Sequence, residues 1–149
     1  MSSIENHKKI INGLIKRGDK EIDYFFKFIS YWIAFNCWLV AKTNEDRDRD
    51  ALDKLYKESG LYGNFSNIIN GNNKKLFDDL ADIRPIENKG TRHFLNNVND
   101  FKEVMNFLYA IRCNLFHGRK SDNNERDCEV INAAAPVLEI VVKNICLED

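Results

Sequence analysis

The apolar residues at the start of the chain recur every three or four positions, which is the spacing of amphipathic helices. A first helix is predicted to begin after Ser2 or Ser3, either of which can cap it, and to end at Gly18. A second helix is predicted to open at Asp19 and run to about residue 41. Because the second helix is apolar nearly all round, we expect it to be the buried centre of the fold, with its two tryptophans mostly buried.

The middle of the chain mixes short helical patterns with turn-forming residues. Residues 44–50 are highly charged and indicate either a solvated linker or a first helical turn, and residues 51–56 predict a short helix ended by Gly60. Residues 60–98 contain many asparagines and glycines, so we expect loops around one short helix near residues 75–82.

Two longer helices are predicted after this irregular region. Asn99 or Asp100 can cap the first of them, which Gly118 would close, and an Asp122 with Glu125 capping box opens the last. Pro136 should kink the last helix, because it removes one backbone donor. The pattern as a whole predicts one all-α domain over residues 1–149. We expect an up-and-down bundle of four to five main helices, with an irregular loop region near residues 60–98.

Composition supports helices and limits the choice of partners. The 149 residues include 22 Lys plus Arg against 23 Asp plus Glu, a balance that excludes both a disordered polyelectrolyte and a strongly basic protein that wraps nucleic acid. Contact with RNA would therefore use a local patch. Seven glycines and two prolines are too few for an all-β sandwich or for the glycine-rich loops of a nucleotide-binding fold.

The cysteines and the N-terminus indicate where the protein works. The four cysteines are widely spaced without a C-x-x-C pair, and residues 1–9 lack a secretory pattern, so we expect a reduced, cytoplasmic protein. Residues 24–41 are apolar enough to suggest a membrane span. However, Lys27, Ser30 and Asn36 interrupt the run and most of its bulk is aromatic, which favours a core helix and no membrane partner.

The candidate chemistry lies around Arg112 and His117. Arginine can hold a phosphate through a bidentate fork and histidine can move a proton near neutral pH, so the pair suits metal-free attack on a phosphodiester. An ordinary surface arginine and a capping histidine at a helix end are the alternative. On a regular helix the two side chains lie about 140° apart, so one copy alone makes a poor site. A twofold axis beside the helix would let Arg112 of one copy meet His117 of another.

The segment RCNLFHG, residues 112–118, resembles the R-x4-6-H motif of the ribonuclease-type members of the HEPN (higher eukaryotes and prokaryotes nucleotide-binding) superfamily. The segment YWIAFN, residues 31–36, is similar to an earlier core helix of these proteins. The resemblance implies a helical homodimer that places two Arg and His pairs in one cleft and cuts RNA without a metal or other cofactor. It implies catalytic roles for Arg112 and His117, with Asn114 as a supporting polar residue.

Further residues could assist such a site. Asn36 could orient His117 or a phosphate, or it could be a satisfied core amide. Arg119 and Lys120 flank the motif and are candidate RNA contacts, as is Arg92 in a basic segment, although loop cations are commonly just solvated. Cys113 and His117 have the spacing of a metal-binding pair on a helix. No second pair at ligand spacing exists in the sequence, so we expect no metal site.

The sequence therefore predicts a metal-independent endoribonuclease that cuts RNA by 2′-hydroxyl attack in a homodimer cleft. The resemblance suggests a toxin or phage-defence effector, whose further partner would be an antitoxin or a larger defence system. The alternative is a non-catalytic HEPN-like module that binds RNA, a nucleotide or a protein. Near-neutral net charge favours this alternative, and so does Cys113, which stands where many family members have a polar residue after the arginine.

Overall fold

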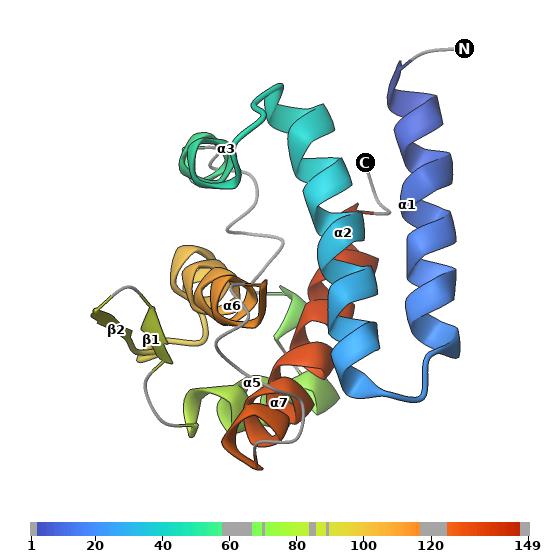
Figure 1. Cartoon of the computed structure of the whole chain (residues 1–149). Coiled ribbons are helices and arrows are strands. Elements are labelled where there is room, and N and C mark those ends of the chain that lie inside the picture. The colour runs from blue at the N-terminus through green and yellow to red at the C-terminus, as the bar shows by residue number, and fades with distance from the viewer. Residues whose placement is uncertain are drawn as a thin grey trace.

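The protein is an all-α helical bundle, as the apolar spacing predicts (Figure 1). The computed structural model describes residues 3–57, 67–69, 71–83, 86–88, 90–116 and 125–146. Its helices are α1 (Ser3–Lys20), α2 (Tyr24–Thr43), α3 (Asp48–Leu55), η1 (Gly71–Asn73), α5 (Lys74–Ala81), α6 (Phe101–Phe116), α7 (Glu125–Val141) and the π-helix η2 (Val142–Cys146).

Helix α2 is the centre of the bundle. It packs against α1, α3, α7 and η2. In Figure 1, α1 and α2 run antiparallel side by side, and α6 crosses beside α2 and is seen nearly end-on. Trp32 and Trp38 are 2% and 4% exposed, which confirms their predicted burial. The aromatic side chains of α2 thus supply much of the core that joins the other helices.

Gly18 does not end the first helix, which continues to Lys20, so this prediction was wrong. The second helix also starts later than predicted, because Asp23 caps it by accepting a hydrogen bond from the backbone N–H of Phe25 at 2.7 Å. The ring of Tyr31 explains the glycine. A Cβ at residue 18 would lie 2.6 Å from Tyr31 Cε1, so only glycine lets α1 and α2 approach this closely. The proposed Ser2 or Ser3 cap lies outside the described side chains.

One face of α2 is open, although the sequence predicts that this helix is the buried centre of the fold. Phe26 is 52% exposed and Ile33 is 45% exposed, and Ile22, just before the helix, is also exposed. Helix α2 is long and apolar enough to cross a membrane by length and composition alone, a test that the core helix of a bundle also passes. The open face makes α2 both a core helix and a surface.

The irregular region contains more structure than the turn-forming residues predict. Helix α5 confirms the short helix expected near residues 75–82. A hairpin follows, in which β1 (Ile86–Asn88) pairs antiparallel with β2 (Thr91–His93), and Gly90 in its turn has a φ of 80°. The predicted helix end at Gly60 lies outside the described residues.

Helix α6 begins where the sequence predicts. Asp100 Oδ1 accepts hydrogen bonds from the backbone N–H groups of Lys102 and Glu103 at 3.0 and 3.4 Å, which is an N-cap. Helix α7 continues through Pro136 and passes into the π-helix η2. The predicted end of α6 at Gly118 and the Asp122 side of the capping box lie outside the described residues.

Candidate active site

Arg112 lies near the C-terminal end of α6 and contacts Asp48 and Tyr109. Its Nη2 is 3.5 Å from Asp48 Oδ2, and its Cζ is 5.9 Å from the centre of the Tyr109 ring, within cation–π range. Tyr109 is one helical turn earlier on the same helix. The Arg112 side chain is 26% exposed, so it is packed against these residues and partly open to solvent.

Asp48 connects three helices at this point. It sits in the first turn of α3, where an acidic side chain is favoured by the helix dipole. Its Oδ1 accepts a hydrogen bond from Nδ2 of Asn36 on α2, while its Oδ2 pairs with Arg112 on α6. We call Asn36, Asp48, Tyr109 and Arg112 the Asp48 network. Its geometry requires the packing of α2, α3 and α6 around one carboxylate.

The environment of Tyr109 is partly apolar and partly charged. Burial raises the pKa of Tyr109, Cys113 and Asp48 raise it further, and Arg112 partly offsets them. The ring also packs 6.2 Å from that of Trp32 in the core. A neutral, anchored tyrosine is therefore a rigid platform on which the guanidinium of Arg112 rests.

The other predicted site residues are placed differently. Asn114 is half-buried on α6, about 160° around the helix axis from Arg112, so the two do not share a face. Arg92 is exposed on β2, in the hairpin whose first strand packs against α6. His117, Arg119 and Lys120 lie outside the described residues. The structure thus brings together Arg112 and Asn36, and it separates Asn114 from them.

Sequence reasoning missed two members of the site. Tyr109 precedes Arg112 by three positions, a spacing that places two side chains on one helix face, so this contact could have been found. Asp48 lies in a charge run that indicated a linker or a first helical turn, and the structure confirms the turn. Its pairing with Arg112 depends on tertiary packing and leaves no local signal.

Cys113 follows Arg112 and is 5% exposed, with its sulfur 3.9 Å from Nη1 of Arg112. A thiol here adds a weak contact to the guanidinium. Among the described residues, no group of three or more His, Cys, Asp or Glu side chains is placed to hold a metal ion. The Asp48 network can orient the guanidinium of Arg112. An oriented guanidinium suits recognition of a phosphate or stabilisation of negative charge on it.

No family model, curated protein or solved structure matches the chain. The resemblance of RCNLFHG to the HEPN motif therefore stays a prediction.

Proposed function

We propose that the protein is a metal-independent endoribonuclease in which Arg112 and His117 act on the scissile phosphate. The observation that carries the proposal is the side chain of Arg112, which contacts Asp48 and Tyr109 and is partly exposed. A positioned arginine loses little freedom when it binds a phosphate and can offset charge that grows in the transition state.

The proposed reaction is an internal transfer within RNA. His117 accepts the proton of the ribose 2′-hydroxyl, the 2′-oxygen bonds to phosphorus, and the bond from phosphorus to the 5′-oxygen breaks. A proton from an acid completes the departing 5′-hydroxyl, and Arg112 offsets the added negative charge on the phosphate oxygens. The products are a 2′,3′-cyclic phosphate and a 5′-hydroxyl.

The proposal includes a homodimer, and the open face of α2 supports it. Phe26, Ile33 and Asn36 lie within about 80° of one another around the α2 axis. The exposed apolar side chains are therefore on the same side as the Asp48 network. A second copy that covers this face would bring two Arg112 side chains toward one cleft, and exposed apolar surface favours such an association.

Sedimentation of the protein at micromolar concentration tests the dimer. We expect a dimer for the unchanged chain and a monomer for Ile33→Asp. Asn12→Asp is the matched control, because Asn12 is exposed on α1. A monomeric unchanged chain would contradict the composite site. The biological setting that we propose, from the sequence resemblance, is a cytoplasmic toxin or phage-defence effector with RNA as its target.

A second candidate is a module that binds RNA, a nucleotide or a protein without turnover. The ion pair with Asp48 favours it, because a carboxylate at 3.5 Å partly offsets the charge that Arg112 would offer to a phosphate. The two candidates differ in turnover. A binding module would retain RNA intact through long incubation at low salt.

RNA incubated with the protein in a chelating buffer separates the two functions. We expect cutting by the unchanged chain, loss of cutting in His117→Ala, and no change in Arg17→Ala, whose parent side chain is 73% exposed on α1. Retarded but uncut RNA would establish the binding module instead. Cutting that survives His117→Ala would remove the histidine from the mechanism.

A further inference from the structure

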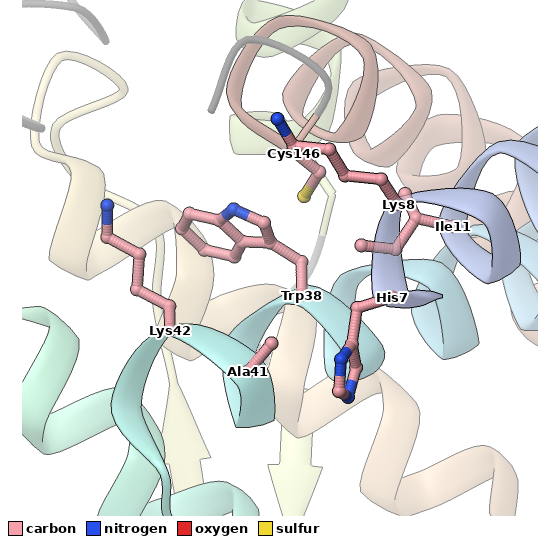
Figure 2. A pocket seen from close by; sticks show the side chains of 7 residues that line it. All are labelled: His7, Lys8, Ile11, Trp38, Ala41, Lys42 and Cys146. Atoms are coloured by element: carbon pink, nitrogen blue, oxygen red, sulfur yellow. The ribbon is translucent and has the colours of Figure 1, made fainter. Parts of the chain in front are cut away.

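A pocket of about 400 Å³ lies between α1, α2 and the C-terminal π-helix η2. Its inner wall is apolar and is formed by Trp38, Ile11 and Cys146, which are 4%, 2% and 1% exposed. Ala41 contributes a small side chain beside the indole, as Figure 2 shows. A small-molecule site of this size commonly has an apolar body and a few polar groups.

The charged side chains that line this pocket are two lysines. Lys8 and Lys42 line it, as does His7, and Lys42 Nζ is 5.8 Å from the centre of the Trp38 ring. In Figure 2 the ammonium groups of Lys8 and Lys42 lie on two sides of the indole. The described lining residues include no acidic side chain. The pocket therefore combines an apolar floor with positive charge at its rim.

We propose that this pocket binds a small organic anion with a flat apolar body, such as an aromatic carboxylate, sulfonate or phosphate monoester. The apolar part would pack on Ala41 and on the exposed edge of Trp38, and the anionic group would pair with Lys8 and Lys42. Inorganic anions lack the body that the indole would contact, and a neutral aromatic compound lacks the charge that the lysines would pair with.

The pocket is separate from the Asp48 network. Trp38 and Asn36 lie about 160° apart around the α2 axis, so the two sites occupy opposite sides of that helix. Binding in the pocket does not depend on Arg112 or His117. The proposed anion binding is therefore independent of the proposed ribonuclease function.

Calorimetric titration of the full chain with 8-anilinonaphthalene-1-sulfonate tests the proposal. We expect a Kd on the order of 10–100 µM, from the usual binding energy per atom of a ligand of this size. Lys8→Gln and Lys42→Gln should each weaken binding roughly three- to tenfold, because each removes a charge-assisted contact. Lys9→Gln and Lys16→Gln are matched controls, since both lysines are exposed on α1 and neither lines the pocket.

Two further comparisons define the ligand class. The neutral analogue N-phenyl-1-naphthylamine should bind at least about tenfold more weakly than the probe. Inorganic sulfate should give no saturable binding in the same concentration range. Ala41→Phe should block the probe by filling the pocket while both lysines remain. Circular dichroism measures whether each variant is folded. If Ala41→Phe does not fold, the lysine variants alone test whether the probe binds in the pocket.

Several outcomes would overturn the proposal. These are no saturable binding of the probe, equal affinity for the neutral analogue, and unchanged affinity in the Lys8→Gln, Lys42→Gln double variant. Binding that persists in folded Ala41→Phe would place the probe elsewhere, for example on the open face of α2, and would also overturn it.

Discussion

Two polar networks contact different sides of α2, and they differ in how deeply their charged side chains are buried. The first connects α2 with α1, α7 and η2. The buried hydroxyl of Tyr31 donates to Asp19 Oδ1 at 2.7 Å and to Glu139 Oε1 at 3.1 Å, and Lys143 pairs with both carboxylates. The charged side chains of this Tyr31 network are 37–40% exposed, so its only buried member is a neutral phenol.

The Asp48 network places its charges deeper. The side chains of Asp48 and Arg112 are 14% and 26% exposed, and together they form the ion pair. Burying a charged pair costs desolvation energy that its mutual attraction often fails to recover, so such a pair is weak evidence for stability. The comparison shows that the charges of the Tyr31 network stay near solvent, whereas the Asp48 network keeps a charged pair deeper in the fold.

The largest expected effect is on catalysis, in Arg112→Lys. Lysine keeps the charge but loses the planar fork, so we expect the cleavage rate to fall roughly a hundredfold while RNA affinity falls much less. Single-turnover cleavage and RNA titration at one fixed salt concentration measure the two quantities separately. An equal loss in both would show that Arg112 only binds RNA.

Gly18→Ala tests the close approach on which the Tyr31 network depends. The new methyl group would overlap the Tyr31 ring, so we expect the free energy of unfolding to fall by about 1–3 kcal/mol. Gly13→Ala on the same helix is the matched control, because a Cβ there meets nothing within 4 Å. The control should gain about 0.4–1 kcal/mol. Chemical denaturation measures both, and equal effects would contradict the proposed contact.

Tyr31→Phe removes the shared donor and keeps the ring. We expect a loss of about 1–2 kcal/mol in the free energy of unfolding, as for a hydrogen bond to charged acceptors. Urea denaturation at neutral pH measures it, with Tyr24→Phe at the exposed start of α2 as the control. Equal stability of the two variants would show that the hydroxyl of Tyr31 contributes nothing.

The same variant should change the dependence of stability on pH. Burial raises the pKa of Tyr31 above its ordinary value of 10.0, and the hydrogen bond to Asp19 raises it further. Above about pH 10 the unfolded state loses the phenol proton that the folded state retains. The free energy of unfolding should therefore fall as the pH rises past about 10. Tyr31→Phe should fall less steeply there. An identical alkaline decline in both proteins would contradict this assignment.

Asp19 sets the acid side of the same network. Burial alone would raise its pKa, but the hydrogen bond from Tyr31 and the ammonium of Lys143 bring the pKa below the ordinary 3.8. Its stabilising contribution is therefore present above the unfolded value and is lost as the pH falls below it. Denaturation between about pH 5 and 2 should show less acid sensitivity in Asp19→Asn than in the unchanged chain.

Asp48→Asn should have a smaller effect on catalysis than Arg112→Lys. It retains the shape of the side chain but removes the ion pair with Arg112, so we expect roughly a tenfold fall in cleavage rate with unchanged or tighter RNA binding. Asp50→Asn, exposed on the same helix, is the matched control. Faster cleavage by Asp48→Asn would show that Asp48 restrains Arg112 instead of positioning it.

The amino-acid sequence predicts the helices of this protein better than it predicts their contacts. Local chemistry identified the Asp100 cap and the short helix α5, because caps and apolar spacing act within a few residues. Gly18 was misread, since a glycine needed for close packing has the same local appearance as one that ends a helix. The hairpin was missed because its three-residue strands are too short for alternation to be visible.

The sequence predicts only part of the candidate site, because the contacts of that site depend on tertiary packing. Arg112 and Asn36 were selected by residue type and by resemblance, and packing does connect them. The connection passes through Asp48, which no pattern within either helix could indicate. The open face of α2 was also missed, since composition reports how apolar a helix is and not which of its sides the other helices cover.

End-group analysis of RNA cut in a chelating buffer tests the central claim most directly. Attack by the ribose hydroxyl predicts a 2′,3′-cyclic phosphate and a 5′-hydroxyl, and it predicts that a single 2′-deoxy residue at the cut site blocks cleavage. His117→Ala should abolish both products. A plain 5′-phosphate with a 3′-hydroxyl, or cleavage of all-deoxy DNA at a comparable rate, would contradict the mechanism assigned to Arg112 and His117.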